Sequence, residues 1–196
     1  GKTHEKRKEQ ACEGVFPVFH CTQEIPCNPC TSVCPIDGIK IENNDLMGLP
    51  DFEGTCLGCM KCVVICPGLA VTIVDYRKNS EMPTVIVPFE INPDMYKVGD
   101  KIKLVDVDGN FLYESEVTHI RNTKERTQLI SCQVPKEYSQ KVVSIRIQEP
   151  EMPEKVDEIT KESPDNIIIC RCERVTLGEV REAIRSGVRD LNHLKA

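Results

Sequence analysis

Two cysteine-rich stretches decide the fold of this chain: CTQEIPCNPCTSVCP at residues 21–35 and CLGCMKCVVICP at residues 56–67. They hold eight of the twelve cysteines, and each ends in Cys-Pro. Three cysteines with two residues between each pair can place their thiolates around one iron–sulfur cube. The fourth cysteine precedes a proline, which disfavours helix at that position, and therefore points away from the other three. The stretches predict a metal-cluster protein.

The second stretch resembles the cysteine run that holds two 4Fe-4S clusters in bacterial ferredoxins, in which the fourth cysteine ligates the cluster of the other half. The resemblance therefore implies crossed ligation. One 4Fe-4S cluster would be held by Cys21, Cys27, Cys30 and Cys66, and the other by Cys34, Cys56, Cys59 and Cys62. The first half departs from the pattern, because residues 22–26 stand where the usual motif has two residues. Cys12 is the alternative to Cys21.

An internal repeat follows the two stretches. Ile39 and Ile41 come after the first Cys-Pro at the same spacing as Val71 and Ile73 after the second. Alternating apolar residues are typical of strands, so we expect these two short strands to pair as the small sheet of a ferredoxin-like fold. Residues 42–55 are polar and contain Asn and Gly, which indicates a turn and a connecting loop.

The cysteines also allow two other interpretations, zinc binding and disulfide formation. Paired Cys-x-x-Cys units also bind zinc, although three evenly spaced cysteines followed by Cys-Pro are unusual for zinc sites. Disulfides are typical of secreted chains, and this chain opens on charged residues without the apolar core of a signal peptide. His20 is a further candidate ligand beside Cys21, but eight cysteines already complete two clusters. Reduced cysteines predict a cytoplasmic protein.

Composition excludes two classes of partner. The net charge is -6, which disfavours binding to nucleic acid. No apolar run approaches the roughly 20 residues that a membrane-spanning helix needs, so we expect no transmembrane segment. With 196 residues, no Trp and few other aromatic residues, the chain is expected to consist of small modules that fold around metal.

Beyond residue 80 the apolar pattern has a period of two, which is typical of strands. The candidate strands cover residues 85–87, 101–107, 111–117, 127–134 and 142–147, and Asp108-Gly109-Asn110 is typical of a hairpin turn. We expect a small antiparallel β-barrel or sandwich. It holds no grouping of acid, base and nucleophile; Cys132 is expected to be a buried apolar residue and His119 an ordinary strand residue.

The C-terminal stretch NIIICRCERVTLGEV at residues 166–180 resembles the start of a BFD-like (bacterioferritin-associated ferredoxin-like) 2Fe-2S domain. The resemblance implies Cys170 and Cys172 as 2Fe-2S ligands. The second cysteine pair of that family is absent up to Ala196, so we expect either that a C-terminal part is missing or that the module keeps only its fold for docking. Thr176 and Glu179 predict a capping box, Gly187 predicts the end of that helix, and a second helix should begin near residue 190.

The sequence thus predicts an α+β chain of five parts. They are an N-terminal arm (1–20), a dicluster ferredoxin-like domain (21–80), an antiparallel β module (81–148), an acidic proline-containing linker (149–165) and a short helical BFD-like segment that is incomplete (166–196).

This combination resembles the iron–sulfur subunits of multi-subunit FAD-dependent amino-acid and amine dehydrogenases. That family acts on proline, hydroxyproline, sarcosine-like amines and opines, and includes hydrogen cyanide synthases. The resemblance implies a non-catalytic electron-transfer subunit that passes single electrons between FAD or FMN sites on partner subunits of a hetero-oligomer. The alternatives are a ferredoxin-type subunit of another oxidoreductase, such as a hydrogenase or a 2-oxoacid enzyme, and a structural iron–sulfur scaffold.

Overall fold

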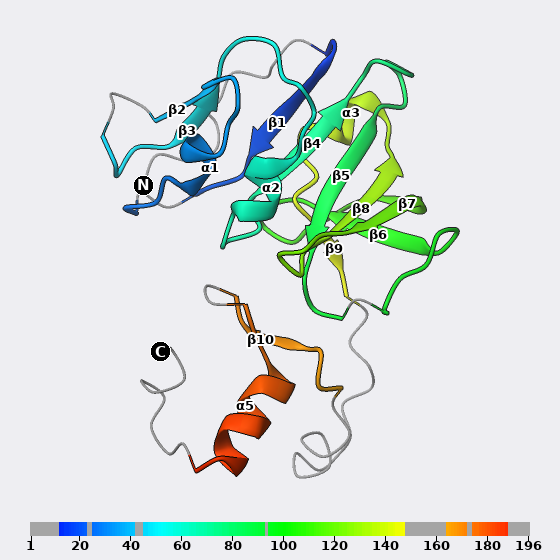
Figure 1. Ribbon diagram of the computed structural model, residues 1–196. Coiled ribbons are helices and arrows are strands. Elements are labelled where there is room, and N and C mark those ends of the chain that lie inside the picture. Colours follow the sequence, from blue (N-terminus) through cyan, green and yellow to red (C-terminus); the bar gives the residue numbers. More distant parts are fainter. Residues whose placement is uncertain are drawn as a thin grey trace.

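The computed structural model describes residues 12–22, 25–41, 45–92, 94–147, 164–171 and 174–187. The largest element is a seven-stranded antiparallel sheet (Figure 1). In spatial order its strands are β1 (Val15–Phe19), β4 (Val71–Asp75), β5 (Thr84–Phe89), β8 (Gln128–Gln133), β7 (Phe111–Asn122), β6 (Lys101–Val105) and β9 (Ser144–Arg146). The helices are short: α1 (Pro29–Ser32), α2 (Lys61–Ile65), α3 (Lys136–Ser139) and α5 (Leu177–Arg185). The α+β class is confirmed.

The sheet does not close into a barrel in the described part of the chain. β1 forms one edge and β9 the other, and β9 is hydrogen-bonded to β6. Of the two predicted forms, barrel or sandwich, the closed barrel is therefore wrong, whereas the antiparallel strands and the hairpin between β6 and β7 are confirmed. In the hairpin turn, the carboxylate of Asp106 accepts hydrogen bonds from the backbone N–H groups of Asp108 and Asn110 at 3.0 and 2.8 Å.

The central strands of the sheet are buried on both faces. Successive residues of a strand point to opposite faces. Val74, Val85 and Ile130 therefore belong to the core enclosed by the curved sheet. Ile73, Ile86 and Leu129 belong to a second core that packs against the cysteine-rich helices. Both cores therefore pack on the same sheet. The hairpin between β4 and β5 crosses residues 80 and 81, where the sequence predicts a domain boundary.

The two repeats do not pair with each other. β2 (Ile39–Ile41) pairs with β3 (Pro50–Phe52), while β4 pairs with β1. The expected pairing is wrong, and part of the predicted loop is a strand. A short connection between β2 and β3 closes at a low entropy cost. β1 contains Pro17, which an edge strand tolerates because a ladder hydrogen bond is not needed on its outer side.

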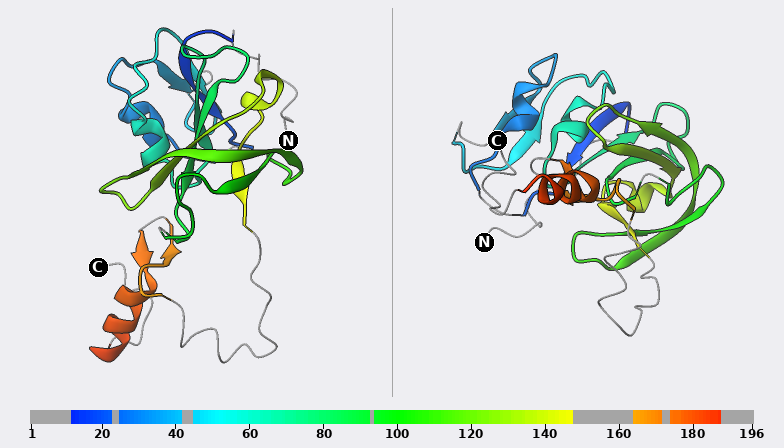
Figure 2. Two further views of the ribbon diagram at one scale, coloured as in Figure 1. Left: turned by 90° about the vertical axis from the view of Figure 1, so that its right-hand side faces the viewer. Right: turned by 60° about the horizontal axis from the view of Figure 1, so that its bottom comes forward.

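The C-terminal segment forms a small unit beyond one end of the sheet (Figures 1 and 2). β10 (Ile168–Cys170) pairs with β11 (Val175–Thr176), and α5 follows. The capping box is confirmed, because Glu179 N donates to Thr176 Oγ1 and Thr176 N donates to Glu179 Oε2. Gly187 has a φ of 96°, as predicted for the helix end. The second predicted helix lies outside the described residues, as does most of the predicted linker.

The cap of α5 also forms an ion pair with the connection between β7 and β8. Both terminal nitrogens of Arg126 donate to the Glu179 carboxylate, at 2.7 Å each. These bonds, with those from Thr176, lower the pKa of Glu179 to about 2. The folded pKa lies below the unfolded value of about 4.3, so this stabilisation is complete above about pH 4.3 and is lost as the pH falls toward 2.

Replacing Glu179 with Gln is therefore expected to weaken α5 by about 1 kcal/mol at pH 7, because the cap and the ion pair lose their charge. Hydrogen exchange of residues 174–187 measures the change. Glu182→Gln is the matched control, since this exposed glutamate lies on the same helix. Equal acceleration in both variants would contradict a specific contribution of the cap.

Candidate cluster sites

The turns around α1 and α2 position the cysteines. Cys30 lies on α1 and Cys62 on α2. Gly58 and Met60, just before α2, have φ values of 66° and 65°, so the chain bends sharply between the cysteines there. Cys66 ends α2 in an extended conformation (φ −70°, ψ 111°), as expected for the residue before a proline. The fourth cysteine of this stretch is thereby separated from the helix that carries the third.

One pocket combines the fourth cysteine of the first stretch with three from the second. Cys34, Cys56, Cys59 and Cys62 all line it, among apolar residues that include Pro17, Ile36 and Ile73. Burial raises the pKa of Cys62 to about 12, and the nearby thiolates of Cys56 and Cys59 act in the same direction. Burial also raises the pKa of Cys56, with a further contribution from Cys34. Electrostatic interactions thus link Cys62 with Cys56 and Cys59, and Cys56 with Cys34.

A second pocket shows the reverse combination. It is lined by Cys21, Cys27, Cys30 and Cys66, together with Ile25, Leu49 and Val71. Burial raises the pKa of Cys30 to about 12, and the thiolates of Cys21, Cys66 and Cys27 add to the increase. The structure thus brings together the same sets of four that the ferredoxin resemblance implies. Which cysteines ligate iron stays a prediction.

The donors and their surroundings fit iron–sulfur clusters. Thiolates suit these clusters, and N–H groups directed at sulfur help to set their potentials. Gly38, Gly58 and Ala70 donate backbone N–H bonds to the sulfurs of Cys34, Cys56 and Cys66 at 3.3–3.4 Å. Within the described ranges, no three His, Cys, Asp or Glu side chains are placed to hold a single metal ion. A cluster would hold its four thiolates farther apart than a single ion does, because its iron and sulfide atoms would lie between them.

His20 lies beside the second pocket but is held by the protein. Its side chain is buried, and Nε2 lies 2.9 Å from Thr72 Oγ1. Its backbone N–H donates to the Ala70 carbonyl at 2.7 Å. The structure therefore gives the histidine a packing and hydrogen-bonding role at the wall of the pocket.

The other described cysteines, Cys12, Cys132 and Cys170, line neither pocket. Cys132 on β8 is fully buried, which confirms the predicted apolar role. Cys12 contacts Gln140 near the other core, so the structure does not favour it as a replacement for Cys21. Cys170 is partly buried on β10, and Cys172 lies outside the described residues.

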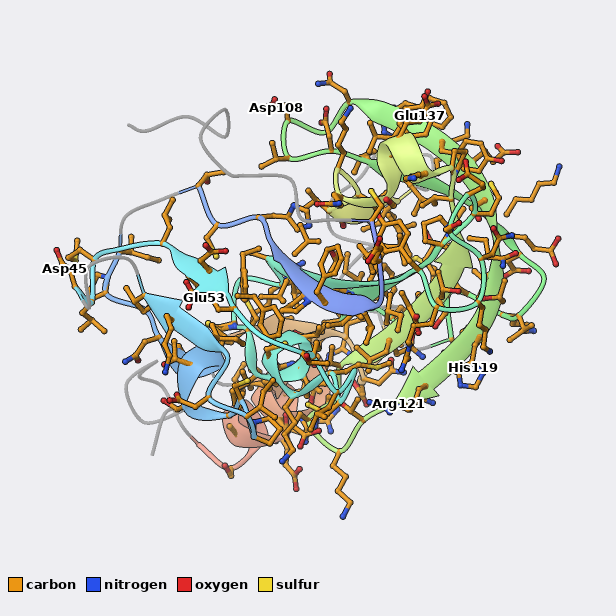
Figure 3. The ribbon with its side chains drawn as sticks, turned by 90° about the horizontal axis from the view of Figure 1, so that it is seen from above. Asp45, Glu53, Asp108, His119, Arg121 and Glu137 are labelled. Atoms are coloured by element: carbon orange, nitrogen blue, oxygen red, sulfur yellow. The ribbon has the colours of Figure 1, made fainter. Side chains whose placement is uncertain are left out.

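His119 and Arg121 are exposed on β7, on the other side of the molecule from Asp45 and Glu53 (Figure 3).

Replacing Cys132 with Ala should leave the iron content unchanged and lower the free energy of unfolding by about 1 kcal/mol, because a small void opens in a closed core. Anaerobic iron analysis and denaturant titration measure the two quantities. Loss of half the iron would show that Cys132 is a ligand.

Sequence reasoning missed a charged junction between the C-terminal segment and the sheet. Arg174 forms an ion pair with Glu90, whose side chain is only 1 % exposed. The same guanidinium donates to Thr127 Oγ1 and to the Val64 carbonyl, the latter at 2.7 Å. Glu90 follows directly on β5, and no local pattern relates it to an arginine that is far away in the sequence. Only the apolar run of β5 signals that a residue here is buried.

Comparison with known proteins gives one local similarity. No protein-family model matches the chain, and no solved structure matches it significantly. The chain is 35 % identical over 68 residues to the "Putative electron transport protein YsaA" of Escherichia coli (strain K12). The similarity covers 31 % of this chain and 41 % of that protein, so the chain spans about two-fifths of the relative's length. No described helix is both long and apolar enough to cross a membrane.

Proposed function

We propose that this chain is an electron-transfer protein that carries electrons singly through two 4Fe-4S clusters. The observation that carries the proposal is the gathering of eight cysteines into two pockets, each lined by four thiols from both stretches. The local similarity to a protein described as an electron transport protein supports the general role.

In this proposal Cys21, Cys27, Cys30 and Cys66 hold one cluster, and Cys34, Cys56, Cys59 and Cys62 hold the other. Bound clusters supply reversible one-electron chemistry. The protein fixes the thiolates, surrounds them with apolar side chains that limit water, and directs backbone N–H groups at the sulfurs.

The positions of individual cysteines suggest a path. Cys30 and Cys62 interact electrostatically, and their helices are in contact, so these two residues mark the side on which the pockets adjoin. Cys59 is exposed and lines the pocket that also contains Cys34. We infer that electrons pass between the clusters on the α1–α2 side and exchange with a partner on the Cys59 side.

We further propose that the partners are flavin subunits of an amino-acid or amine dehydrogenase, on which the carbon–nitrogen bond is oxidised. The order of the ferredoxin-like stretch, the β strands and the Cys-x-Cys segment supports this assignment. In this role the chain carries electrons and performs no substrate chemistry. A subunit of another oxidoreductase would share the clusters but not this substrate class.

Anaerobic purification from the native source, followed by iron and sulfide analysis and EPR with and without candidate amino acids such as proline, tests the proposal. We expect about eight irons per chain, or about ten if a complete 2Fe-2S site is present. Copurifying flavin subunits and substrate-dependent cluster signals would identify the dehydrogenase complex. Zinc in place of iron, or clusters that no substrate or chemical reductant can reduce, would rule out electron transfer and leave the structural scaffold.

A further inference from the structure

One arginine connects the C-terminal segment to both the sheet and a cysteine-bearing helix. Arg174 stands just before β11 and reaches Glu90 at the end of β5 and Thr127 at the start of β8. Its Nη2 donates to the Val64 carbonyl on α2 at 2.7 Å. Arg174 has a φ of 54°, in the left-handed region that non-glycine residues seldom adopt, so its backbone is held in an unusual conformation at this junction.

The contact on α2 lies close to a predicted ligand. Val64 belongs to the last turn of a five-residue helix, whose final carbonyls lack partners within the helix and favour a cation. Cys66 follows two residues later. Burial lowers the pKa of Arg174, and the nearby Cys66 thiolate opposes this effect. Arg174 is therefore a cation next to the pocket lined by Cys21, Cys27, Cys30 and Cys66.

The Glu90–Arg174 pair is oriented so that its positive side lies toward α2. Nη1 faces Glu90 and Thr127, whereas Nη2 faces α2. The pair is neutral as a whole, but its positive side is toward Cys66. Glu90 is almost fully buried, and its second carboxylate oxygen has no hydrogen-bond partner in the described structure. A buried carboxylate depends on its cation, because a buried charge without a partner is strongly destabilising. Arg174 is thus a charged link to this buried carboxylate that holds the segment in place, beside the exposed ion pair of Arg126 with Glu179.

We propose that Arg174 couples the docking of residues 164–171 and 174–187 to the charge of the cluster at Cys21, Cys27, Cys30 and Cys66. This inference rests on the proposed function. One electron from the donor adds one negative charge to that site, and the positive side of the Glu90–Arg174 pair then attracts it more strongly. Docking is tighter in the reduced protein and looser after the electron has left. Linkage makes the effect reciprocal, so docking raises the reduction potential of the same cluster.

The coupling places the C-terminal cysteine segment under redox control. Cys170 on β10 is paired with Val175, the residue that follows Arg174. The contacts of Arg174 hold β10 and β11, and with them Cys170, on the α2 side of the molecule.

Hydrogen exchange of the iron-loaded protein, oxidised and dithionite-reduced, measures the docking of residues 164–171 and 174–187. We expect the open fraction of the wild type to fall about tenfold on reduction, within the usual range of coupling between sites. By linkage, this tenfold change corresponds to a potential difference of about 59 mV between docked and undocked forms for a one-electron couple. The double variant Glu90→Gln with Arg174→Gln removes both charges without leaving a buried carboxylate unpaired. It should lose the tenfold difference, and its cluster potential should fall.

Arg185→Gln is the matched control, because Arg185 is exposed on α5 of the same segment. It should retain the redox difference and the potential of the wild type. Arg174→Lys keeps the charge and should keep the direction of the redox effect, with weaker docking in both states. Equal exchange of the oxidised and reduced wild type, or an unchanged tenfold difference in the double variant, would overturn this inference alone. A protein that binds no iron would overturn the proposed function as well.

Discussion

Replacing Cys34 with Ser is expected to remove the cluster of the other stretch and to leave the cluster of its own stretch in place. Cys34 lines a pocket with three cysteines of the second stretch, while Cys66 lines a pocket with three of the first. Each single variant, Cys34→Ser or Cys66→Ser, should therefore lower the iron content from about eight to about four per chain, since each removes one ligand of a different cube.

Double variants decide whether the ligation is crossed. Two replacements at one cluster should cost no more iron than a single replacement, whereas replacements at different clusters should add. Cys34→Ser combined with Cys59→Ser should retain about four irons, and Cys34→Ser combined with Cys27→Ser should retain almost none. Cys12→Ser is the control and should retain both clusters. If the combination with Cys27 retains half the iron, each stretch holds its own cluster and the crossed assignment is wrong.

Spacing groups the three cysteines within each stretch, whereas the fourth member of each set comes from the resemblance to bacterial ferredoxins. The pockets are lined by the same two sets of four, and which cysteines ligate iron stays a prediction. The hairpin at Asp108–Asn110 and the cap formed by Thr176 and Glu179 could be predicted because their information is local. Each involves residues only a few positions apart, where side-chain chemistry alone limits the conformations.

The sheet could not be predicted because its pairing is not local. Val15–Phe19 lies in the predicted N-terminal arm and supplies the edge strand beside β4, more than fifty residues away in the sequence. The repeat suggested that residues 39–41 and 71–73 are partners, but a short apolar run does not specify which other run it meets. The continuous apolar runs in β4 and β5 reflect burial on both faces, which the sequence alone does not distinguish from one thick core. The sheet extends across the predicted boundary between residues 80 and 81.

Removing iron from the loaded protein is expected to unfold the cysteine-rich loops and to spare the sheet. Amides of α1 and α2 should exchange about 100-fold faster after anaerobic chelation, which corresponds to about 2.7 kcal/mol of lost local stability. Amides of β5 and β8 should change by less than about threefold, because their ladder and core remain. Hydrogen exchange with mass spectrometry measures both regions in one sample. Reloading with iron and sulfide should restore the original protection.

The difference arises from what holds each region. α1 and α2 have four and five residues, far fewer than the roughly 12–15 that an isolated helix needs in water. Three of the buried residues in their core are the cysteines Cys30, Cys62 and Cys66, whose sulfurs face pockets that a cluster would fill. The enclosed core of the sheet instead contains Leu104 and Ile130, which are fully buried without any cluster. If α1 and α2 stay protected after iron is removed, packing on Ile73, Ile86 and their neighbours is sufficient to keep these helices folded. The clusters would then add electron transfer to a region that is already folded.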